Sequence, residues 1–280
     1  MVKYIGAHFS SLNGLDSVFF EANKINANAI SFFVKSPRKW FDKEIDNNLI
    51  KNFKYNMKKY NFTYNQILPH AGYLINLCNP NKKKNFLSKK SFLSEIIICN
   101  KLGIKYINVH PGNYIEKNNI KTCFKIAANV INEIFCETKN ISIVLENTSG
   151  MGTSIGYKFE HLYELINLVN DTSRIGICID TCHLFSSGYD ISNIEGIQKV
   201  FFEFDKLIGF NYLKGIHLND SIGSLGSKID RHENLGFGKI GNDIFSFIME
   251  NKKFDNIPII LETKRKHLFK DEIFFLKSFF

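Results

Sequence analysis

The stretch IGICIDTCHLFSSGYD, residues 175–190, begins as an apolar run and then changes abruptly in character. Ile175, Ile177 and Ile179 alternate in the way that is typical of a buried β-strand. Asp180 ends this run and His183 follows three positions later, where packing alone would favour a plain turn. The stretch therefore predicts a buried strand that delivers a carboxylate and an imidazole to its C-terminal end.

Other segments share the short apolar pattern of this strand. The strand candidates are residues 4–7, 29–33, 65–70, 106–110, 141–146, 175–180, 214–219 and 257–262. Helical periodicity lies between them, most clearly over 49–60, 120–134 and 200–208, with a shorter candidate over 15–22. Strands that alternate with helices pair in parallel through right-handed crossovers, and eight such units in about 250 residues are typical of a barrel. We therefore predict an α/β fold of the (β/α)8 TIM barrel class.

The chain contains no linker rich in proline, glycine or serine, so we expect one barrel domain over residues 1–280. An open doubly wound sheet is the alternative. That fold would favour a G-x-G-x-x-G turn after the first strand, and IGAHFSSLNG at residues 5–14 does not contain this pattern. The barrel is therefore the favoured fold.

Composition indicates a globular protein. The 280 residues are 44% hydrophobic, which is enough to bury a large core. No apolar run approaches the roughly 18 residues of a membrane span, and the N-terminus lacks a signal-peptide pattern, so we expect a cytoplasmic protein with no membrane partner. The six cysteines form no C-x-x-C pair and are expected to be reduced. The net charge of +9 suits phosphate binding, but abundant Lys, Asn, Ile and Phe suit AT-biased coding equally well.

Residue types that bind metals recur at the ends of the strand candidates. From the third strand to the eighth, these residues are His70, His110, Glu146, Asp180, His217 and Glu262. His183 follows the sixth strand, and the run KIDRHEN after the seventh adds Asp230 and His232. The C-terminal ends of barrel strands converge on one face, where active sites are built. One histidine there would more often be structural, but a whole cluster would repel or stay unpaired without cations.

This residue set indicates a catalytic metal centre. Histidine and carboxylate ligands leave room for water, whereas structural zinc sites are usually closed by cysteine. The set exceeds the need of one tetrahedral ion and suits two or three ions of the zinc or manganese type. Cys182 could add a ligand, but we expect it to pack away from the mouth. Closely spaced ions that share a carboxylate are used by nucleases and phosphatases to hydrolyse phosphodiesters.

Several motifs, occurring in order, resemble one family. They are QILPH (66–70), NVHPG (108–112), VLENTSGMG (144–152), GICIDTCH (176–183), GIHLND (215–220), DRHENLGFG (230–238) and IILET (259–263). With them the chain, from KYIGAHFS onward, resembles bacterial endonuclease IV, the zinc-dependent apurinic/apyrimidinic endonuclease of base excision repair. The resemblance implies a (β/α)8 barrel with three zinc ions, and manganese as an alternative at one position.

The resemblance also implies a ligand set and a reaction. The implied sets are His70, His110 and Glu146 for the first ion, Glu146, Asp180, His217 and Glu262 for the second, and His183, Asp230 and His232 for the third. Glu146, as the bridge, and Glu262, which would help to orient the water, are the implied catalytic residues. The implied reaction cuts the phosphodiester 5′ to an abasic site in duplex DNA and leaves a 3′-hydroxyl. Cleaning of blocked 3′ ends would accompany it.

Two loops resemble the DNA-contacting loops of the family. KSPRKW (35–40) resembles the loop that inserts an arginine into the minor groove, which makes Arg38 the candidate. HAGYLIN (70–76) resembles the loop whose Tyr73 and Leu74 wedge into the base stack. Such wedges recover part of the cost of unstacking a flipped nucleotide. Ordinary core packing is the alternative for Tyr73 and Leu74.

The chain departs from the family pattern on the DNA side. The family commonly has glutamine at the positions of Pro37 and Met151, and both glutamines contact DNA. We therefore expect the metal chemistry to be kept, and DNA affinity or abasic-site selectivity to be weaker.

Two other functions stay open at this point. Sugar isomerases and epimerases share metal-centred barrels, but they usually need one or two ions, so the group with Asp230 and His232 argues against them. A non-catalytic binder of damaged DNA would have a degenerate metal site, and the intact residue types argue against that function. The expected partner is duplex DNA with abasic sites or blocked 3′ ends, bound by a monomer.

Overall fold

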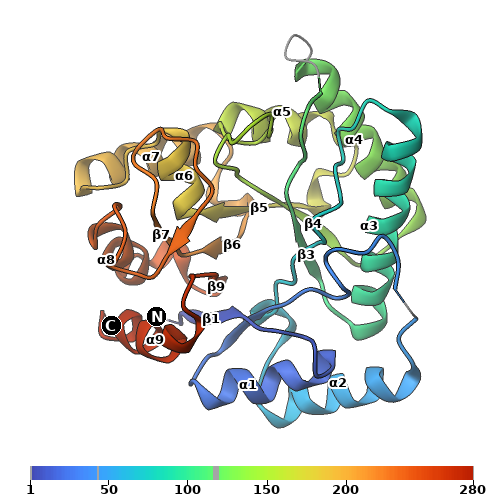
Figure 1. Cartoon of the computed structure of the whole chain (residues 1–280), viewed down its shortest axis with the longest axis horizontal. Coiled ribbons are helices and arrows are strands. Elements are labelled where there is room, and N and C mark those ends of the chain that lie inside the picture. Colours follow the sequence, from blue (N-terminus) through green and yellow to red (C-terminus); the bar gives the residue numbers. More distant parts are fainter. Residues whose placement is uncertain (1, 43, 116–119, 280) are drawn as a thin grey trace.

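Seven parallel strands form the centre of the part of the chain that the structure describes. The structure, a computed structural model, describes residues 2–42, 44–115 and 120–279. The strands are β1 (Tyr4–His8), β2 (Ala29–Ser31), β3 (Tyr106–Val109), β4 (Ser142–Glu146), β5 (Ile175–Asp180), β6 (Leu213–His217) and β9 (Pro258–Leu261). They pair in the order β2-β1-β9-β6-β5-β4-β3. Helices surround this curled sheet (Figure 1).

The third predicted strand, residues 65–70, is not a regular strand. Tyr64–Gln66 form a 3-10 turn (η2), and residues 67–70 run between β2 and β3 through isolated parallel bridges. Pro69 has no N–H to donate, so a continuous ladder is interrupted there. Its carbonyl still accepts from the Asn108 N–H at 2.8 Å. The segment closes the barrel irregularly, so the predicted (β/α)8 class is confirmed while the third strand is wrong in detail.

The outer layer follows the predicted helical periodicity. The α-helices are α1 (Val18–Lys24), α2 (Asn47–Lys59), α3 (Lys82–Leu102), α4 (Ile120–Glu137), α5 (Phe159–Leu168), α6 (Thr181–Ser187), α7 (Ile194–Leu207), α8 (Asp243–Glu250) and α9 (Phe269–Lys277). Further 3-10 turns are η1 (Leu15–Ser17), η3 (Thr172–Arg174), η4 (Phe210–Tyr212), η5 (Lys252–Phe254) and η6 (Lys266–Leu268). Phe53 in α2, Ile131 in α4 and Val200 in α7 are buried, as predicted for the inner faces.

A small hairpin after β6 has no counterpart in the sequence prediction. Its strands are β7 (Asp220–Ser221) and β8 (His232–Glu233), which pair antiparallel. Two-residue strands carry too little periodicity to be recognised from sequence. Among the described residues, no helix is both long enough and apolar enough to cross a membrane.

The pairing of β1 with β2 leaves no room for a side chain at Gly6. Gly6 lies opposite Ala29, and a Cβ there would overlap the Ala29 carbonyl oxygen, a backbone atom that cannot move alone. Gly6→Ala is expected to lower the free energy of unfolding by about 1–3 kcal/mol, the usual cost of overpacking, in urea denaturation. Gly152→Ala is the control for substitution strain alone, because its φ is 61° and a Cβ there would contact nothing. A Gly6→Ala midpoint equal to that of the parent would contradict this packing.

Candidate metal centre

The C-terminal ends of the strands bring the predicted ligands together. Glu146, Asp180 and His217 are the last residues of β4, β5 and β6, and all three are fully buried. His110 and Glu262 directly follow β3 and β9. Because parallel strands end at one face of the barrel, these side chains meet at its mouth.

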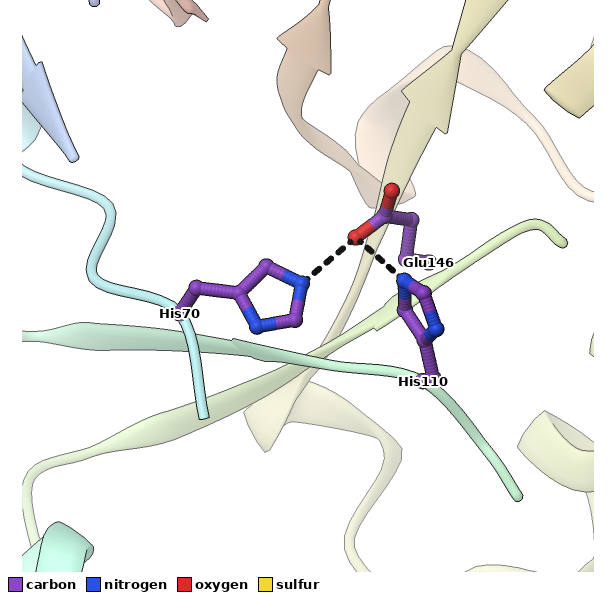
Figure 2. Close-up of side chains that lie close together, drawn as sticks. All are labelled: His70, His110 and Glu146. Carbon is purple, nitrogen blue, oxygen red and sulfur yellow. Dashed lines mark hydrogen bonds and ion pairs between the residues drawn. The ribbon is translucent and has the colours of Figure 1, made fainter. Parts of the chain in front are cut away.

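Glu146 lies at the centre of this cluster. Its Oε2 lies 3.1 Å from His70 Nε2 and 3.3 Å from His110 Nε2. Figure 2 shows both imidazoles turned toward this one oxygen. Its Oε1 lies 3.1 Å from His217 Nδ1, which is also 3.3 Å from Glu262 Oε2. The two carboxylate oxygens therefore face two different sets of side chains. This is the arrangement needed to bridge two adjoining ions.

Among the described residues, three sets contain all nine candidate ligands, and a fourth, overlapping group joins Asp180 and His232 to Cys182. The sets are His70, His110 and Glu146; Glu146, Asp180, His217 and Glu262; and His183, Asp230 and His232. Within each set, one potential ligand atom per residue lies within 4.8 Å of the others. These are the sets that the family resemblance implies. Each set has the residues to hold one ion, and their role as ligands stays a prediction.

Buried ring nitrogens provide a test of whether the site fits metal ions. His183 Nε2 lies 3.2 Å from Asp230 Oδ1, and His232 Nε2 lies 3.4 Å from Asp180 Oδ2. Neither nitrogen has a partner in hydrogen-bond geometry among the described residues, although both are buried. Buried polar atoms are nearly always hydrogen-bonded, so such contacts without a directed hydrogen bond are better suited to a shared cation. The donor set therefore fits metal binding.

The other ring nitrogen of several histidines is held by a backbone carbonyl. The pairs are His70 Nδ1 with Ala71 O (2.7 Å), His183 Nδ1 with Asn147 O (2.9 Å) and His232 Nδ1 with Glu262 O (3.2 Å). A proton on Nδ1 donates to these oxygens and leaves Nε2 with a free lone pair. Metal-binding histidines are commonly oriented in this way.

The charges of the cluster compensate one another. Burial alone would raise the pKa of Glu146, but the imidazoles of His217 and His110 hold the pKa well below its usual range. Burial alone would lower the pKa of His183, but Asp180 and Asp230 raise the pKa well above its usual value. Without another cation, protons on His183 and His217, whose pKa values are raised, help to balance the carboxylates. A divalent ion would displace these protons and take over the same role.

Two asparagines that the sequence analysis missed hold the carboxylates in place. Asn108 Nδ2 donates to Glu146 Oε2. Asn219 Nδ2 donates to Asp180 Oδ2 at 2.7 Å, and Asn219 Oδ1 accepts from the Glu262 N–H at 2.8 Å. Both asparagines are fully buried. Each lies two residues from a predicted ligand, inside the motifs NVHPG and GIHLND, and this proximity was the only signal in the sequence.

Asp220, which the sequence analysis also missed, supports the third set. Its carboxylate accepts backbone N–H groups of Ser221 (2.7 Å), Gly236 (3.0 Å), Gly238 (2.9 Å) and Ile240 (3.0 Å). The side chain is fully buried, so these donors replace its water. Asp220 thereby fixes the turn that follows His232. The third set thus combines His183 of α6 with Asp230 and His232 of the β7–β8 hairpin, rather than residues at the ends of barrel strands.

The expectation that Cys182 packs away from the mouth is wrong. Cys182 is buried, and its Sγ lies within 4.8 Å of ligand atoms of Asp180 and His232. Burial, and then the Asp180 carboxylate, raise the pKa of this thiol to about 11. The Sγ donates to the Arg231 carbonyl at 3.6 Å. His183, Asp230 and His232 form their set without this thiol, so the third set does not depend on Cys182.

The predicted DNA-contacting residues lie at the surface. Arg38 is exposed, Tyr73 is 66% exposed and Leu74 is 36% exposed. Core packing, the alternative for this pair, is therefore excluded for Tyr73. A cavity of about 400 Å³ is lined by Tyr73 together with candidate ligands, including His110 and Glu262. The aromatic side chain thus lies beside the cluster, as a DNA contact near the reaction centre would.

Comparisons with known proteins place the chain in a family. The profile of the family described as a xylose isomerase-like TIM barrel matches residues 19–279. Probable endonuclease 4 from Buchnera aphidicola subsp. Acyrthosiphon pisum is 47% identical over 277 residues, which cover 99% of both chains. The chain belongs to the endonuclease IV family. Endonuclease IV from Thermus thermophilus has a TM-score of 0.85 at 27% identity, over 99% of this chain and 98% of that one.

Two further proteins are similar to this endonuclease IV family member, one in sequence and one in fold. Apurinic-apyrimidinic endonuclease 1 from Plasmodium falciparum is 47% identical over 260 residues, which cover 93% of this chain but 44% of that protein. A D-tagatose 3-epimerase-like protein has a TM-score of 0.72 at 21% identity, over 99% of this chain and 96% of that one. At this identity the second match shows the fold alone.

Asn219 offers a test of how the endonuclease IV cluster is supported. Asn219→Ala removes the amide that joins Asp180 to the backbone of Glu262. Because such hydrogen bonds orient ligands, the variant is expected to bind Zn²⁺ about 10–100-fold more weakly in competition with a chromogenic chelator. Asn132→Ala is the matched control, since Asn132 makes comparable amide hydrogen bonds with Leu168 and Asn170 outside the cluster. Equal zinc affinity of the two variants would contradict the role of Asn219.

Proposed function

We propose that this member of the endonuclease IV family is a metal-dependent endonuclease that cuts duplex DNA at abasic sites during repair. The observation that carries the proposal is the position of Glu146, whose two oxygens face different sets of candidate ligands. Adjoining metal sites that share a carboxylate are suited to phosphodiester hydrolysis. The names of the Buchnera and Plasmodium relatives support the substrate class.

The proposed cofactor is zinc, with one ion in each of the three ligand sets. Nitrogen and oxygen donors from histidine and carboxylates suit zinc, and manganese is the alternative at one position. Bound ions of this kind supply a nucleophile at neutral pH and stabilise charge on phosphate oxygens. The proposed cut lies on the 5′ side of the abasic nucleotide and leaves a 3′-hydroxyl. Blocked 3′ ends present the same bond and are proposed as further substrates.

Hydrogen bonds and ion pairs within the chain orient the two carboxylates that we propose to be catalytic. Glu262 Oε1 accepts from His8 Nδ1 at 2.8 Å, and Glu262 Oε2 faces His217. Its backbone N–H is held by Asn219. Glu262 is therefore fixed in orientation at the edge of the cavity, and we infer that it orients the attacking water. Glu146 is the second catalytic carboxylate, because it organises two ligand sets at once.

Exposed residues beside the cluster are proposed to deform the DNA. Arg38 would enter the minor groove, and Tyr73 and Leu74 would fill the gap that a flipped abasic nucleotide leaves. Filling that gap offsets an unstacking cost of a few kcal/mol. The net charge of +9 would favour association with DNA phosphates. We further propose a cytoplasmic protein that acts as a monomer, and the presence of all three ligand sets in a single chain supports the monomer.

A sugar epimerase is the second candidate, since the fold is shared with the D-tagatose 3-epimerase-like protein. Fold alone does not decide function. The third set, with His183, Asp230 and His232, argues for the nuclease because a sugar enzyme usually needs one or two ions. The exposed Tyr73 argues in the same direction.

Strand cleavage tests the proposed function directly. A labelled duplex with one abasic site, and an intact duplex beside it, are incubated with purified protein without added magnesium. We expect a cut in the abasic strand alone, with a 3′-hydroxyl at the nick. Chelation should abolish the cut and zinc should restore it, because the bound ions supply the chemistry. Zinc-loaded protein that cuts neither duplex would reject the proposal, and turnover of a ketose would favour the epimerase.

Glu146→Gln tests the bridging carboxylate. Removing its charge disorganises two ligand sets at once, so the cleavage rate is expected to fall by at least about three decades while DNA binding is kept. Glu133→Gln is the matched control, because Glu133 is an exposed partner of Lys89. Cleavage at the parental rate by Glu146→Gln would refute the role assigned to Glu146. Loss of cleavage with retained DNA binding would show that the parent protein is a nuclease and not a non-catalytic DNA binder.

Pro37→Gln tests the departure on the DNA side. An amide at this exposed loop could hydrogen-bond to DNA, which proline cannot do, so the variant is expected to bind the abasic duplex several-fold more tightly. The measurement is the dissociation constant by fluorescence anisotropy, with an intact duplex as the control ligand. Equal constants for the variant and the parent would show that Pro37 does not weaken binding.

A further inference from the structure

A buried ion pair lies beneath the two loops that carry the proposed DNA contacts. Lys35 Nζ lies 2.9 Å from Glu95 Oε1, and the two side chains are only 3% and 1% exposed. Lys35 belongs to the loop after β2, and Glu95 lies in the middle of α3. The pair is outside the three candidate ligand sets. The proposed metal chemistry therefore does not explain it.

Each member of the pair holds one loop by its backbone. Glu95 accepts the Gly72 N–H, with distances of 3.0 and 3.3 Å to its two oxygens. Lys35 Nζ donates to the Lys39 carbonyl at 2.7 Å. The carboxylate thus fixes the start of the segment that carries Tyr73. The ammonium closes the loop around Arg38.

The same helix and the loops themselves add further contacts. Ser91, one turn before Glu95 in α3, donates its hydroxyl to the Trp40 carbonyl at 2.7 Å. The Tyr73 N–H donates to the Pro37 carbonyl at 3.0 Å, which joins the two loops directly. A Cβ on Gly72 would lie 3.1 Å from Glu95 Oε1 and 3.3 Å from Pro37 O, so the contact is close-packed. We call residues 35–40 and 71–74 the paired loops.

The energetics of the pair indicate a role beyond stability. Removing two charges from water is costly, and a buried ion pair often stabilises a protein no better than apolar residues of the same size. What the ion pair adds is a defined orientation of the loops, because the ammonium and the carboxylate form hydrogen bonds only along certain directions. Here those directions hold the exposed side chains of Arg38 and Tyr73 on one rigid unit. Side chains held in advance lose less freedom when they bind.

We propose that Lys35 and Glu95 are positioning residues that lock the paired loops together, so that Arg38 and Tyr73 engage the DNA as one preformed unit. Neither residue belongs to the three candidate ligand sets, and both side chains are buried, so we expect neither of them to contact DNA. The pair therefore sets the affinity and selectivity for abasic duplex, and leaves the hydrolytic centre unchanged. This inference rests on the proposed function, because it assigns the paired loops to DNA.

The test compares Lys35→Met with a control variant, Lys3→Met, which removes a buried ion pair far from the paired loops. Lys3 pairs with Asp255 at 2.8 Å, donates to the Asn251 carbonyl at 2.6 Å, and has a fully buried side chain just before β1. Lys3→Met therefore removes the same kind of contacts at the opposite end of the barrel from the mouth. Glu95→Gln is the conservative variant, since its amide oxygen can still accept from Gly72.

Three readouts separate positioning from folding. The first is the split between kcat and KM on abasic duplex, because loss of folded enzyme lowers the apparent kcat and not KM. The second is the fluorescence of 2-aminopurine beside the abasic site, which reports unstacking by the wedge. The third is turnover of bis(p-nitrophenyl) phosphate, a small diester that needs the hydrolytic centre but no DNA deformation.

We expect Lys35→Met to raise KM for abasic duplex by about 10–100-fold and to reduce the 2-aminopurine signal, because misplaced contacts lose their binding energy. Turnover of the small diester per folded enzyme should match the parent. Glu95→Gln should give a smaller rise in KM. If Lys35→Met does not fold, Ser91→Ala, which removes only the hydrogen bond to Trp40, should raise KM by about threefold or more.

The outcomes distinguish this inference from the proposed function. If the parent cuts abasic duplex and Lys35→Met keeps the KM of Lys3→Met, the positioning role is wrong and the function stands. Where Lys35→Met is unfolded, equal KM for Ser91→Ala and the parent would likewise reject the positioning role. If the zinc-loaded parent cuts no abasic duplex, the function fails and the inference fails with it.

Discussion

The buried charge of Glu146 is the constraint on which the rest of the mouth depends. Its side chain is almost completely buried, where an uncompensated carboxylate would cost several kcal/mol. Imidazoles of His70, His110 and His217 surround it, and Asn108 donates to it. The neighbouring groups therefore have to be arranged around this one side chain. The same arrangement gives its two oxygens separate partners, which is the basis for the two adjoining metal sites that we propose.

The parallel barrel makes such a cluster structurally possible. Parallel strands in register end on one face, so β4, β5 and β6 each deliver their last side chain to the same point. The backbone there is fixed by strand pairing, such as that of Asp180 with His217. Little conformational freedom is then left to lose when ions bind. The third set differs, because Asp230 and His232 come from the β7–β8 hairpin, and the turn that follows β8 depends on the buried carboxylate of Asp220.

The face that we propose to contact DNA shows the same division between buried supporting residues and exposed residues. Arg38 and Tyr73 are exposed, and their loops are tied to α3 through the buried pair of Lys35 and Glu95. The fold is shared with a D-tagatose 3-epimerase-like protein, and a fold alone does not determine the substrate. In the proposed function, the loops decide what reaches the hydrolytic centre. In this proposal the loops determine substrate specificity, and the cluster at the strand ends carries out the hydrolysis.

The sequence by itself determined the barrel class and the residues of the cluster. Alternating apolar runs are periodic, and a polar residue such as Asp180 at the end of a buried run is visible without coordinates. The irregularity of the third strand, residues 65–70, could not be predicted from the sequence. Pro69 interrupts the hydrogen-bond ladder there but leaves the apolar pattern intact. Only the tertiary structure decided the position of Cys182, the supports Asn219 and Asp220, and the pairing of the two loops. These depend on contacts between segments far apart in the chain, such as Asn219 with Glu262, and no local pattern records such contacts.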